Sequence, residues 1–202
     1  MTTRSFYYSF ILFLFSCSFA HANTQPLLAP QVVIAEASAV LLNQLKDPNF
    51  SSDKTRIRQF IDSHIFSSVD TVRMSALVLG KHWRKASKTE KKQFIQSFKQ
   101  LLVNTYAATF TEQFHNWSIQ YAPLKLKDSD TKVLVKTQVQ QAGKPDTQID
   151  YSMVLRKNQW KIYDIKVEGI SLVISNRSTF SQMIKKSGSL AAVISQLQQK
   201  NQ

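Results

Sequence analysis

Apolar residues recur every three or four positions through the first half of the chain, up to about residue 114. This spacing predicts helices over 31–46, from 54 to 65, over 69–84 with a break at Gly80, and over 88–114. Either Ser52 or Asp53 is expected to cap the second helix. Ser87, followed three positions later by Glu90, has the form of a capping box at the start of the fourth.

The fourth predicted helix carries an unusually wide apolar arc. The arc comprises Phe94, Ile95, Phe98, Leu101, Leu102, Thr105, Tyr106, Thr109 and Phe110. Such a helix must be covered on two sides, or on one side with a cavity on the other. Ordinary core packing and a cavity wall both remain open for each of these residues.

After Trp117 the apolar period changes from 3.6 to two, which predicts strands. Strands are expected over 118–127, from 132 to 140, over 149–156 and over 160–167, joined by short turns as an antiparallel meander. In the last strand, strict alternation places Tyr163, Ile165 and Val167 on one face and Trp160, Ile162 and Asp164 on the other. Two short helices close the chain, so the fold class is α+β, with N-terminal helices packed on one face of a curved antiparallel sheet of about four strands.

The N-terminus reads as a signal peptide over 1–22, followed by a single domain over 23–202. Arg4 precedes an uncharged apolar stretch over 6–19, and Ala20-His21-Ala22 has the small-x-small form of a cleavage site. The stretch is shorter than the roughly 20 residues that span a bilayer. An alternative is a lipoprotein signal ending at Cys17. Cleavage after Ala22 places the mature protein in the periplasm, without any cysteine.

Charge and composition narrow the possible chemistry. The chain has 26 Lys and Arg against 13 Asp and Glu, a net charge of +13 that attracts phosphates, although export argues against nucleic acid as the partner. The four glycines are too far apart for a phosphate-binding loop, so nucleotide hydrolysis is excluded. The spacing of His64, His82 and His115 fits no helical metal pair, and we expect neither a metal nor a cofactor.

The best enzyme candidate is Asp164 beside Tyr163, since a buried Asp near a Tyr can abstract a proton next to a carbonyl. Neighbouring strand residues point to opposite faces, however, so Asp164 is expected to cap a helix or pair with a cation instead. An exported enzyme of NTF2-like fold acting on a small apolar substrate is therefore the alternative function. A third possibility is a basic module that binds anionic lipopolysaccharide or polysaccharide.

Several segments together resemble one family. Residues 77–87 read LVLGKHWRKAS and look like its LGxxWRxAT segment, and residues 94–106 follow with Phe94, Phe98 and Leu102 in register. Residues 160–172 read WKIYDIKVEGISL, similar to WxVYDVxVEGVSL, with NRSTF at 176–180. In this order and spacing the segments resemble the MlaC or toluene-tolerance family of periplasmic phospholipid-binding proteins, over roughly 42–197.

The resemblance implies an NTF2-like fold enclosing a deep apolar cavity, and a monomeric, non-enzymatic shuttle for glycerophospholipid between outer and inner membranes that maintains outer-membrane lipid asymmetry. The family's partners are an inner-membrane ABC transporter with a lipid-channel subunit and an outer-membrane lipoprotein associated with a porin. Without a nucleotide site, this chain cannot power lipid extraction, so a partner must drive any uphill step.

Under this interpretation one cavity wall is the sheet and the other is the fourth helix. The expected lipid-contacting residues are Leu79, Trp83, Phe94, Phe98, Leu102, Tyr106, Val133, Val135, Val139, Tyr151, Met153, Tyr163 and Val167. Lys81, Arg84 and Lys85 are expected at the cavity mouth or on a docking surface.

Overall fold

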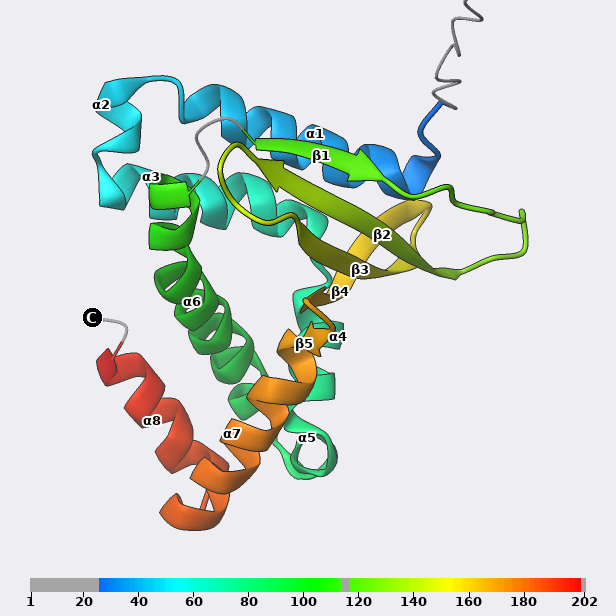
Figure 1. The fold of residues 1–202 in the computed structure, drawn as a ribbon. Helices are drawn as coiled ribbons and strands as arrows, with labels where there is room; N and C mark the ends of the chain where they lie inside the picture. The colour runs from blue at the N-terminus through cyan, green and yellow to red at the C-terminus, as the bar shows by residue number, and fades with distance from the viewer. Residues whose placement is uncertain (1–25, 114–116, 201–202) are drawn as a thin grey trace, which may run out of the picture.

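A computed structural model describes residues 26–113 and 117–200 (Figure 1). The predicted signal peptide, its cleavage site and Cys17 lie outside the described residues. The helices before the sheet are α1 (Ala29–Gln44), α2 (Pro48–Ser51), α3 (Lys54–Phe60), α4 (Thr71–Leu79), α5 (Lys81–Lys85) and α6 (Lys88–Gln113). Between α3 and α4 the chain makes a π-helical turn, η1 (Ile61–Ile65), and a short 3₁₀ turn, η2 (Phe66–Ser68).

The sheet is an antiparallel meander in the order β1-β2-β3-β4-β5. Its strands are β1 (Trp117–Tyr121), β2 (Lys132–Gln141), β3 (Thr147–Arg156), β4 (Gln159–Val167) and β5 (Ile170–Ser171), followed by α7 (Leu172–Ser187) and α8 (Leu190–Lys200). The predicted α+β class and meander are confirmed, and the two-residue β5 adds a fifth strand. Strand β1 is shorter than predicted because Pro123 has no N–H to continue the ladder beyond Ala122, whose N–H donates to the Lys136 carbonyl at 3.0 Å.

The predicted helix boundaries follow from local chemistry. Asp53 caps α3 by accepting from the backbone N–H groups of Thr55 and Arg56. At the start of α6, the Glu90 N–H donates to Ser87 Oγ at 3.2 Å and the Ser87 N–H donates to Glu90 Oε2 at 2.8 Å, which confirms the capping box. These hydrogen bonds lower the pKa of the Glu90 carboxyl below its usual range.

Gly80 separates α4 from α5 in a conformation, with φ of 52° and ψ of −118°, that favours glycine. The guanidinium of Arg177 in α7 lies directly against this residue, where a Cβ at position 80 would clash with Arg177 Nη2. The missing side chain therefore leaves room for the Arg177 guanidinium at the junction between α4 and α5.

Figure 1 shows two parts: the sheet with α1 running along it, and a helical part formed by α4 to α8 that extends away from the sheet. Each part has its own hydrophobic cluster. Ile34 of α1 packs with Val135, Met153, Trp160 and Ile162 of the sheet. The helical part is built around Phe94, Phe98 and Phe180, together with the buried apolar face of α8.

Candidate functional site

One face of the sheet, here called the inner sheet face, carries most of the predicted lipid-contacting strand residues. In β2 these are Val133, Val135 and Val139, which alternate as predicted with exposed residues that are polar except for Leu134. Val135 pairs directly with Tyr151 of β3, and Val133 pairs with Met153. Because paired residues share a face, all five lie on the same side of the sheet.

The inner sheet face is covered unevenly. Val135 and Met153 are almost completely buried beneath Ile34 of α1. Farther along, Ile149, Tyr151 and Ile165 are only half-buried. Val139, toward the far end of β2, is buried as well. The half-buried stretch is therefore the part of this face that has side-chain surface available for a ligand.

Hydroxyl groups interrupt the apolar surface in the middle of the face. Tyr121 of β1 pairs with Thr137 of β2, and Tyr151 lies in the neighbouring row. Burial raises the pKa of Tyr151, with a further rise from Tyr121 beside it and an opposing effect of the hydrogen bond with Thr137. Burial also raises the pKa of Tyr121. Both phenols stay neutral at physiological pH, so these two groups bring no charge to this surface.

Strand β4 departs from the predicted alternation. The register shifts between Ser152 and Met153, which pair with Asp164 and Ile162, so Tyr163 is the extra residue of a β-bulge. Trp160 and Ile162 consequently share the inner face with Ile165 and Val167, and the predicted division of β4 is wrong. Tyr163 instead lies under the guanidinium of Arg73 in α4, 4.5 Å from the ring centroid.

Asp164 has a structural role at the start of α7. Its Oδ2 accepts from Ser171 Oγ at 2.7 Å, and its Oδ1 accepts from the Val173 N–H at 3.1 Å. Ser171 Oγ in turn accepts from the Ile174 N–H at 3.0 Å. These bonds satisfy donors at the first turn of α7, which confirms the expectation that Asp164 caps a helix.

The predicted lipid-contacting residues of the helices lie in the other hydrophobic cluster. Phe94 and Phe98 stack at 5.6 Å, and Phe180 meets both rings edge-on at 5.1 and 5.6 Å. Leu79 and Leu102 are buried in the same cluster, while Trp83 and Tyr106 pack against it half-buried. Phe94, Phe98 and Leu102 of the α6 arc are thus packed in a core with residues of α7 and α8, and lipid contact by the predicted helix residues stays a prediction.

The deep cavity that the resemblance implies also stays a prediction. A hollow of about 530 Å³ opens on the outer side of α6 instead, with an apolar floor and a rim of lysines. It is lined by Val72, Trp83, Lys88, Lys91, Lys92, Ile95, Gln96 and Lys99. The Lys91 ammonium stands 5.4 Å from the Trp83 ring centroid, and Lys99 pairs with Asp62 at 2.8 Å.

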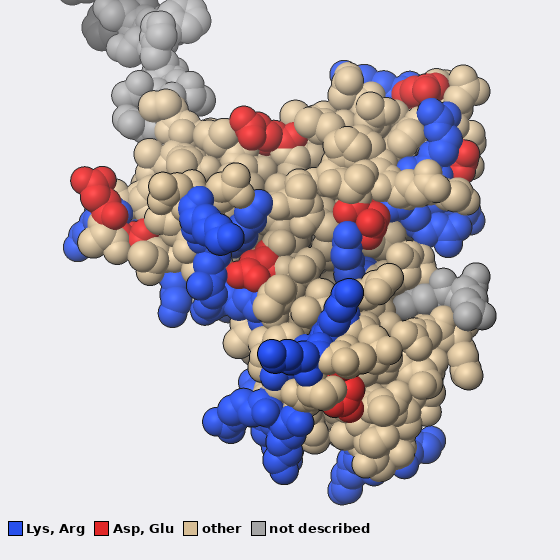
Figure 2. Space-filling model, turned by 180° about the vertical axis from the view of Figure 1, so that it is seen from behind, with Lys and Arg blue, Asp and Glu red and all other residues tan. Residues whose placement is uncertain are grey.

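Positive charge gathers beside this hollow. Lys81, Arg84 and Lys85, here called the basic cluster, are all exposed on the short helix α5. Figure 2 shows Lys and Arg side chains distributed over the face turned away from the viewer of Figure 1, with separate acidic groups between them. Among the ion pairs that the described residues form, Lys99–Asp62 and Arg156–Asp70, none involves the basic cluster.

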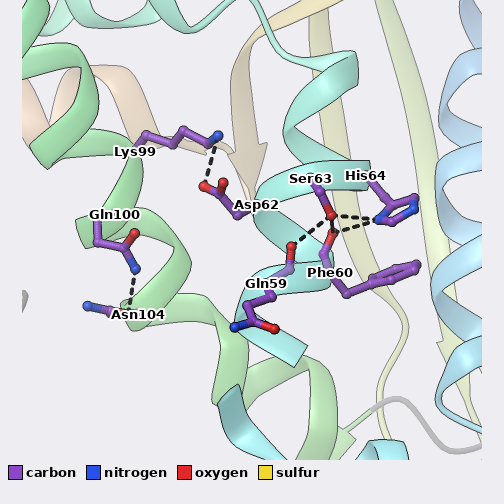
Figure 3. Close-up of polar contacts among 8 residues, drawn as sticks. All are labelled: Gln59, Phe60, Asp62, Ser63, His64, Lys99, Gln100 and Asn104. Atoms are coloured by element: carbon purple, nitrogen blue, oxygen red, sulfur yellow. Dashed lines mark hydrogen bonds and ion pairs between the residues drawn. The ribbon is translucent and has the colours of Figure 1, made fainter. Parts of the chain in front are cut away.

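The closest approach to catalytic geometry is a Ser–His contact in η1 (Figure 3). Ser63 Oγ lies 2.8 Å from His64 Nδ1, and the same hydroxyl donates to the Gln59 carbonyl at 2.8 Å. The nearby carboxylate of Asp62 is paired with Lys99. Both groups are exposed on a helical turn rather than in a pocket, so this contact resembles ordinary helix back-bonding more than a nucleophile and its base.

The part of the chain that the structure describes contains neither a metal-binding cluster nor a helix able to cross a membrane. Within this part, no three His, Cys, Asp or Glu side chains come together in a way that could hold a metal ion. Nor does any helix in 26–113 or 117–200 combine the length and apolar character needed to cross a membrane.

Comparisons with known proteins agree with one another. The chain is 23% identical to the intermembrane phospholipid transport system binding protein MlaC of Haemophilus influenzae, over 85% of this chain and 86% of that protein. Its fold matches the phospholipid-binding protein from Ralstonia solanacearum, solved in complex with a phospholipid, with a TM-score of 0.79 and 26% identity over 86% of this chain and 97% of that one. The family model described as MlaC protein matches residues 35–199, and the chain therefore belongs to the MlaC family.

Proposed function

We propose that this protein binds a glycerophospholipid and carries it between the outer and inner membranes, maintaining outer-membrane lipid asymmetry. The observation that carries the proposal is the fold shared with the Ralstonia solanacearum protein, which was solved with a phospholipid bound. The family match over 165 residues, 35–199, and the similarity to the Haemophilus influenzae protein support the same function.

The half-buried stretch of the inner sheet face supports the proposal physically. Two acyl chains of roughly 14 buried methylenes each represent on the order of 20 kcal/mol of hydrocarbon transfer, so a carrier must replace the bilayer with apolar surface. Ile149, Tyr151 and Ile165 offer such surface on rigid strands. The work of the chain is binding and release, with no bond made or broken.

The proposal places the protein in the periplasm, after cleavage between Ala22 and Asn23. N-terminal sequencing of the exported protein is expected to read Asn-Thr-Gln-Pro, whereas a lipid-modified Cys17 would contradict this. Its proposed partners are an inner-membrane ABC transporter with a lipid-channel subunit and an outer-membrane lipoprotein associated with a porin. The mature domain, 23–202, is proposed to act as a monomer.

Native mass spectrometry after mild purification tests the function directly. We expect the mass of the chain plus one or more glycerophospholipids, identified by tandem fragmentation of the released ligand. A protein that stays bare after incubation with phosphatidylethanolamine–phosphatidylglycerol vesicles would contradict the proposal. An apolar metabolite in place of phospholipid would favour the alternative of an exported enzyme.

The basic cluster is proposed to dock the protein on its partners. Exposed charges attract over about 8 Å at physiological ionic strength, so docking should weaken as salt is raised. Charge reversal of Lys81, Arg84 and Lys85 to Glu should slow transfer between purified partners without emptying the lipid site. Reversal of Lys132 and Lys136, which are exposed on the outer face of the sheet, is the matched control. If the transfer rate changes neither with salt nor with either set of reversals, the basic cluster serves only to keep the protein soluble.

A further inference from the structure

One row of side chains crosses all five strands of the inner sheet face. The pairing register aligns Tyr121, Thr137, Ile149, Val167 and Ile170 from β1 to β5. Exposure rises along this row from buried Thr137 through half-buried Ile149 to Val167 at 38% and Ile170 at 65%. The inner sheet face is therefore continuous with an exposed apolar edge at β5.

The first turn of α7 follows directly after this edge in the chain. Ile174 follows Ile170 by four residues and is 67% exposed, although Asp164 and Ser171 hold the surrounding backbone firmly through the α7 cap. Ile174 is therefore exposed on a hydrogen-bonded backbone and not on a loose loop. We call Val167, Ile170 and Ile174 the apolar lip.

The lip differs from the other exposed aliphatic residues that the structure describes. Leu27 lies before α1, Val40 on α1, Val72 on α4 and Leu134 on the outer face of β2, each in a different part of the fold. Single exposed apolar residues are normal on protein surfaces, whereas contiguous ones mark a contact site. At the lip, by contrast, Val167 and Ile170 pair directly across β4 and β5, and Ile174 follows them in the first turn of α7.

A cation lies beside the lip. Arg177 is three residues after Ile174, so the two side chains are neighbours on the surface of α7. The Arg177 guanidinium rests against Gly80, and Arg177 is absent from both ion pairs formed by the described residues. Exposed aliphatic side chains with an adjoining guanidinium match the two halves of a phospholipid, its hydrocarbon and its phosphate.

We propose that Val167, Ile170 and Ile174 form the lip over which the acyl chains of a phospholipid pass between water and the inner sheet face, with Arg177 beside its phosphate. This inference rests on the proposed function. The lip lowers the barrier to loading and release, because hydrocarbon leaving its donor meets apolar surface before it reaches the half-buried stretch at Ile149. The bound lipid itself lies farther in, so the lip affects rates more than occupancy.

The first experiment measures exchange of a fluorescent phosphatidylglycerol between the protein and vesicles of phosphatidylcholine and phosphatidylglycerol. The variant Ile170→Asp/Ile174→Asp should slow both loading and release by about tenfold, the effect of a modest rise in a barrier. The lipid retained after long incubation should match that of the unchanged protein. The variant is expected to fold, because both side chains are exposed and Asp is favourable in the first turn of a helix.

Matched variants test whether the slower lipid exchange is specific to the lip. Val40→Asp and Leu134→Asp put the same charge on exposed aliphatic positions elsewhere and should leave the exchange rate within about twofold. Ile170→Leu/Ile174→Leu should preserve it. Equal rates for the lip variant and the controls would overturn the inference, as would slowing that appears only when a partner protein is present, because the lip would then bind protein. A parent protein that takes up no phospholipid would overturn the proposed function as well.

A second measurement needs no transfer activity. The proposed mature domain, 23–202, contains no cysteine, so Ile174→Cys in that domain can carry a single bimane fluorophore. Phospholipid with a spin label on its acyl chain should quench this fluorophore transiently during loading, before binding is complete. The same fluorophore at Val40→Cys should not be quenched. Quenching at neither position, or equally at both, would overturn the passage of acyl chains over the lip.

Discussion

The helical cluster and the inner sheet face are both apolar, yet they are packed differently. Phe94, Phe98 and Phe180 are almost completely buried and meet one another at 5.1–5.6 Å. On the sheet, Ile149, Tyr151 and Ile165 keep part of their surface accessible. A filled core contributes stability and leaves no room, whereas incompletely covered apolar strands give up some stability and leave surface for a ligand. The difference separates the part that holds the fold from the part proposed to hold lipid.

The largest effect is expected in the helical cluster. Phe94→Ala should destabilise the protein by about 3–5 kcal/mol, because it removes a fully buried ring between two others. Urea unfolding followed by circular dichroism measures this loss, with the exposed substitution Val72→Ala as the control. If Phe94→Ala kept its stability but lost its bound lipid, the helical cluster would be the lipid site and not the part that holds the fold.

The next effect contrasts the two ends of the inner sheet face. Met153→Trp or Val135→Trp overfills the closed end under Ile34 and should cost about 1–3 kcal/mol or more. Ile149→Trp adds the same ring to the half-buried stretch, where it should displace lipid with little loss of stability. Melting temperature and retained phospholipid, measured on the same samples, distinguish the outcomes. Unchanged lipid content in folded Ile149→Trp would remove this residue from the site.

A smaller effect is expected from the cap on α7. Asp164→Ala leaves the Ser171 hydroxyl and the Val173 N–H without their acceptor and should cost about 1–3 kcal/mol. Asp164→Asn keeps one carbonyl oxygen and should cost less. Hydrogen exchange should show the loss at the start of α7 first. Exchange that accelerates equally across α6 would mean that Asp164 stabilises more than this cap.

The smallest effect concerns the capping box of α6. Ser87→Ala should cost about 1 kcal/mol at neutral pH. Because the folded-state pKa of Glu90 is lowered, its contribution is present above the unfolded-state pKa and is lost as the pH falls through the folded-state value. The stability difference between the unchanged protein and Glu90→Gln should therefore shrink in acid. A difference that is constant with pH would mean that the carboxylate charge is not involved.

Local signals account for what could be predicted from the sequence. Asp53, Ser87 and Gly80 mark helix ends by their own chemistry, and they do so in the structure as expected. The alternation in β2 was also informative, because its two faces differ clearly in polarity. Family resemblance, rather than periodicity, supplied the function.

The bulge in β4 could not be predicted because both faces of that strand carry apolar residues. The bulge at Tyr163 moves Trp160 and Ile162 to the other face. Because that face is apolar too, the sequence shows no contrast in polarity that would indicate the move. The exposed positions of Ile170 and Ile174 were equally hidden, since exposure depends on what packs nearby rather than on residue type. Phe94, Phe98 and Leu102 of α6, which could also have formed a cavity wall, pack in one cluster with residues of α7 and α8, a long-range contact that no local pattern encodes.

The backbone conformation of Gly80 constrains how this protein can diverge in evolution. A methyl group at position 80 meets only the flexible end of the Arg177 side chain, which can move aside, but it also has to adopt a backbone conformation that favours glycine. Replacing Arg177 with a short side chain removes the contact and leaves this backbone penalty unchanged. In an alignment of relatives, we therefore expect glycine to persist at position 80 whatever residue occupies position 177.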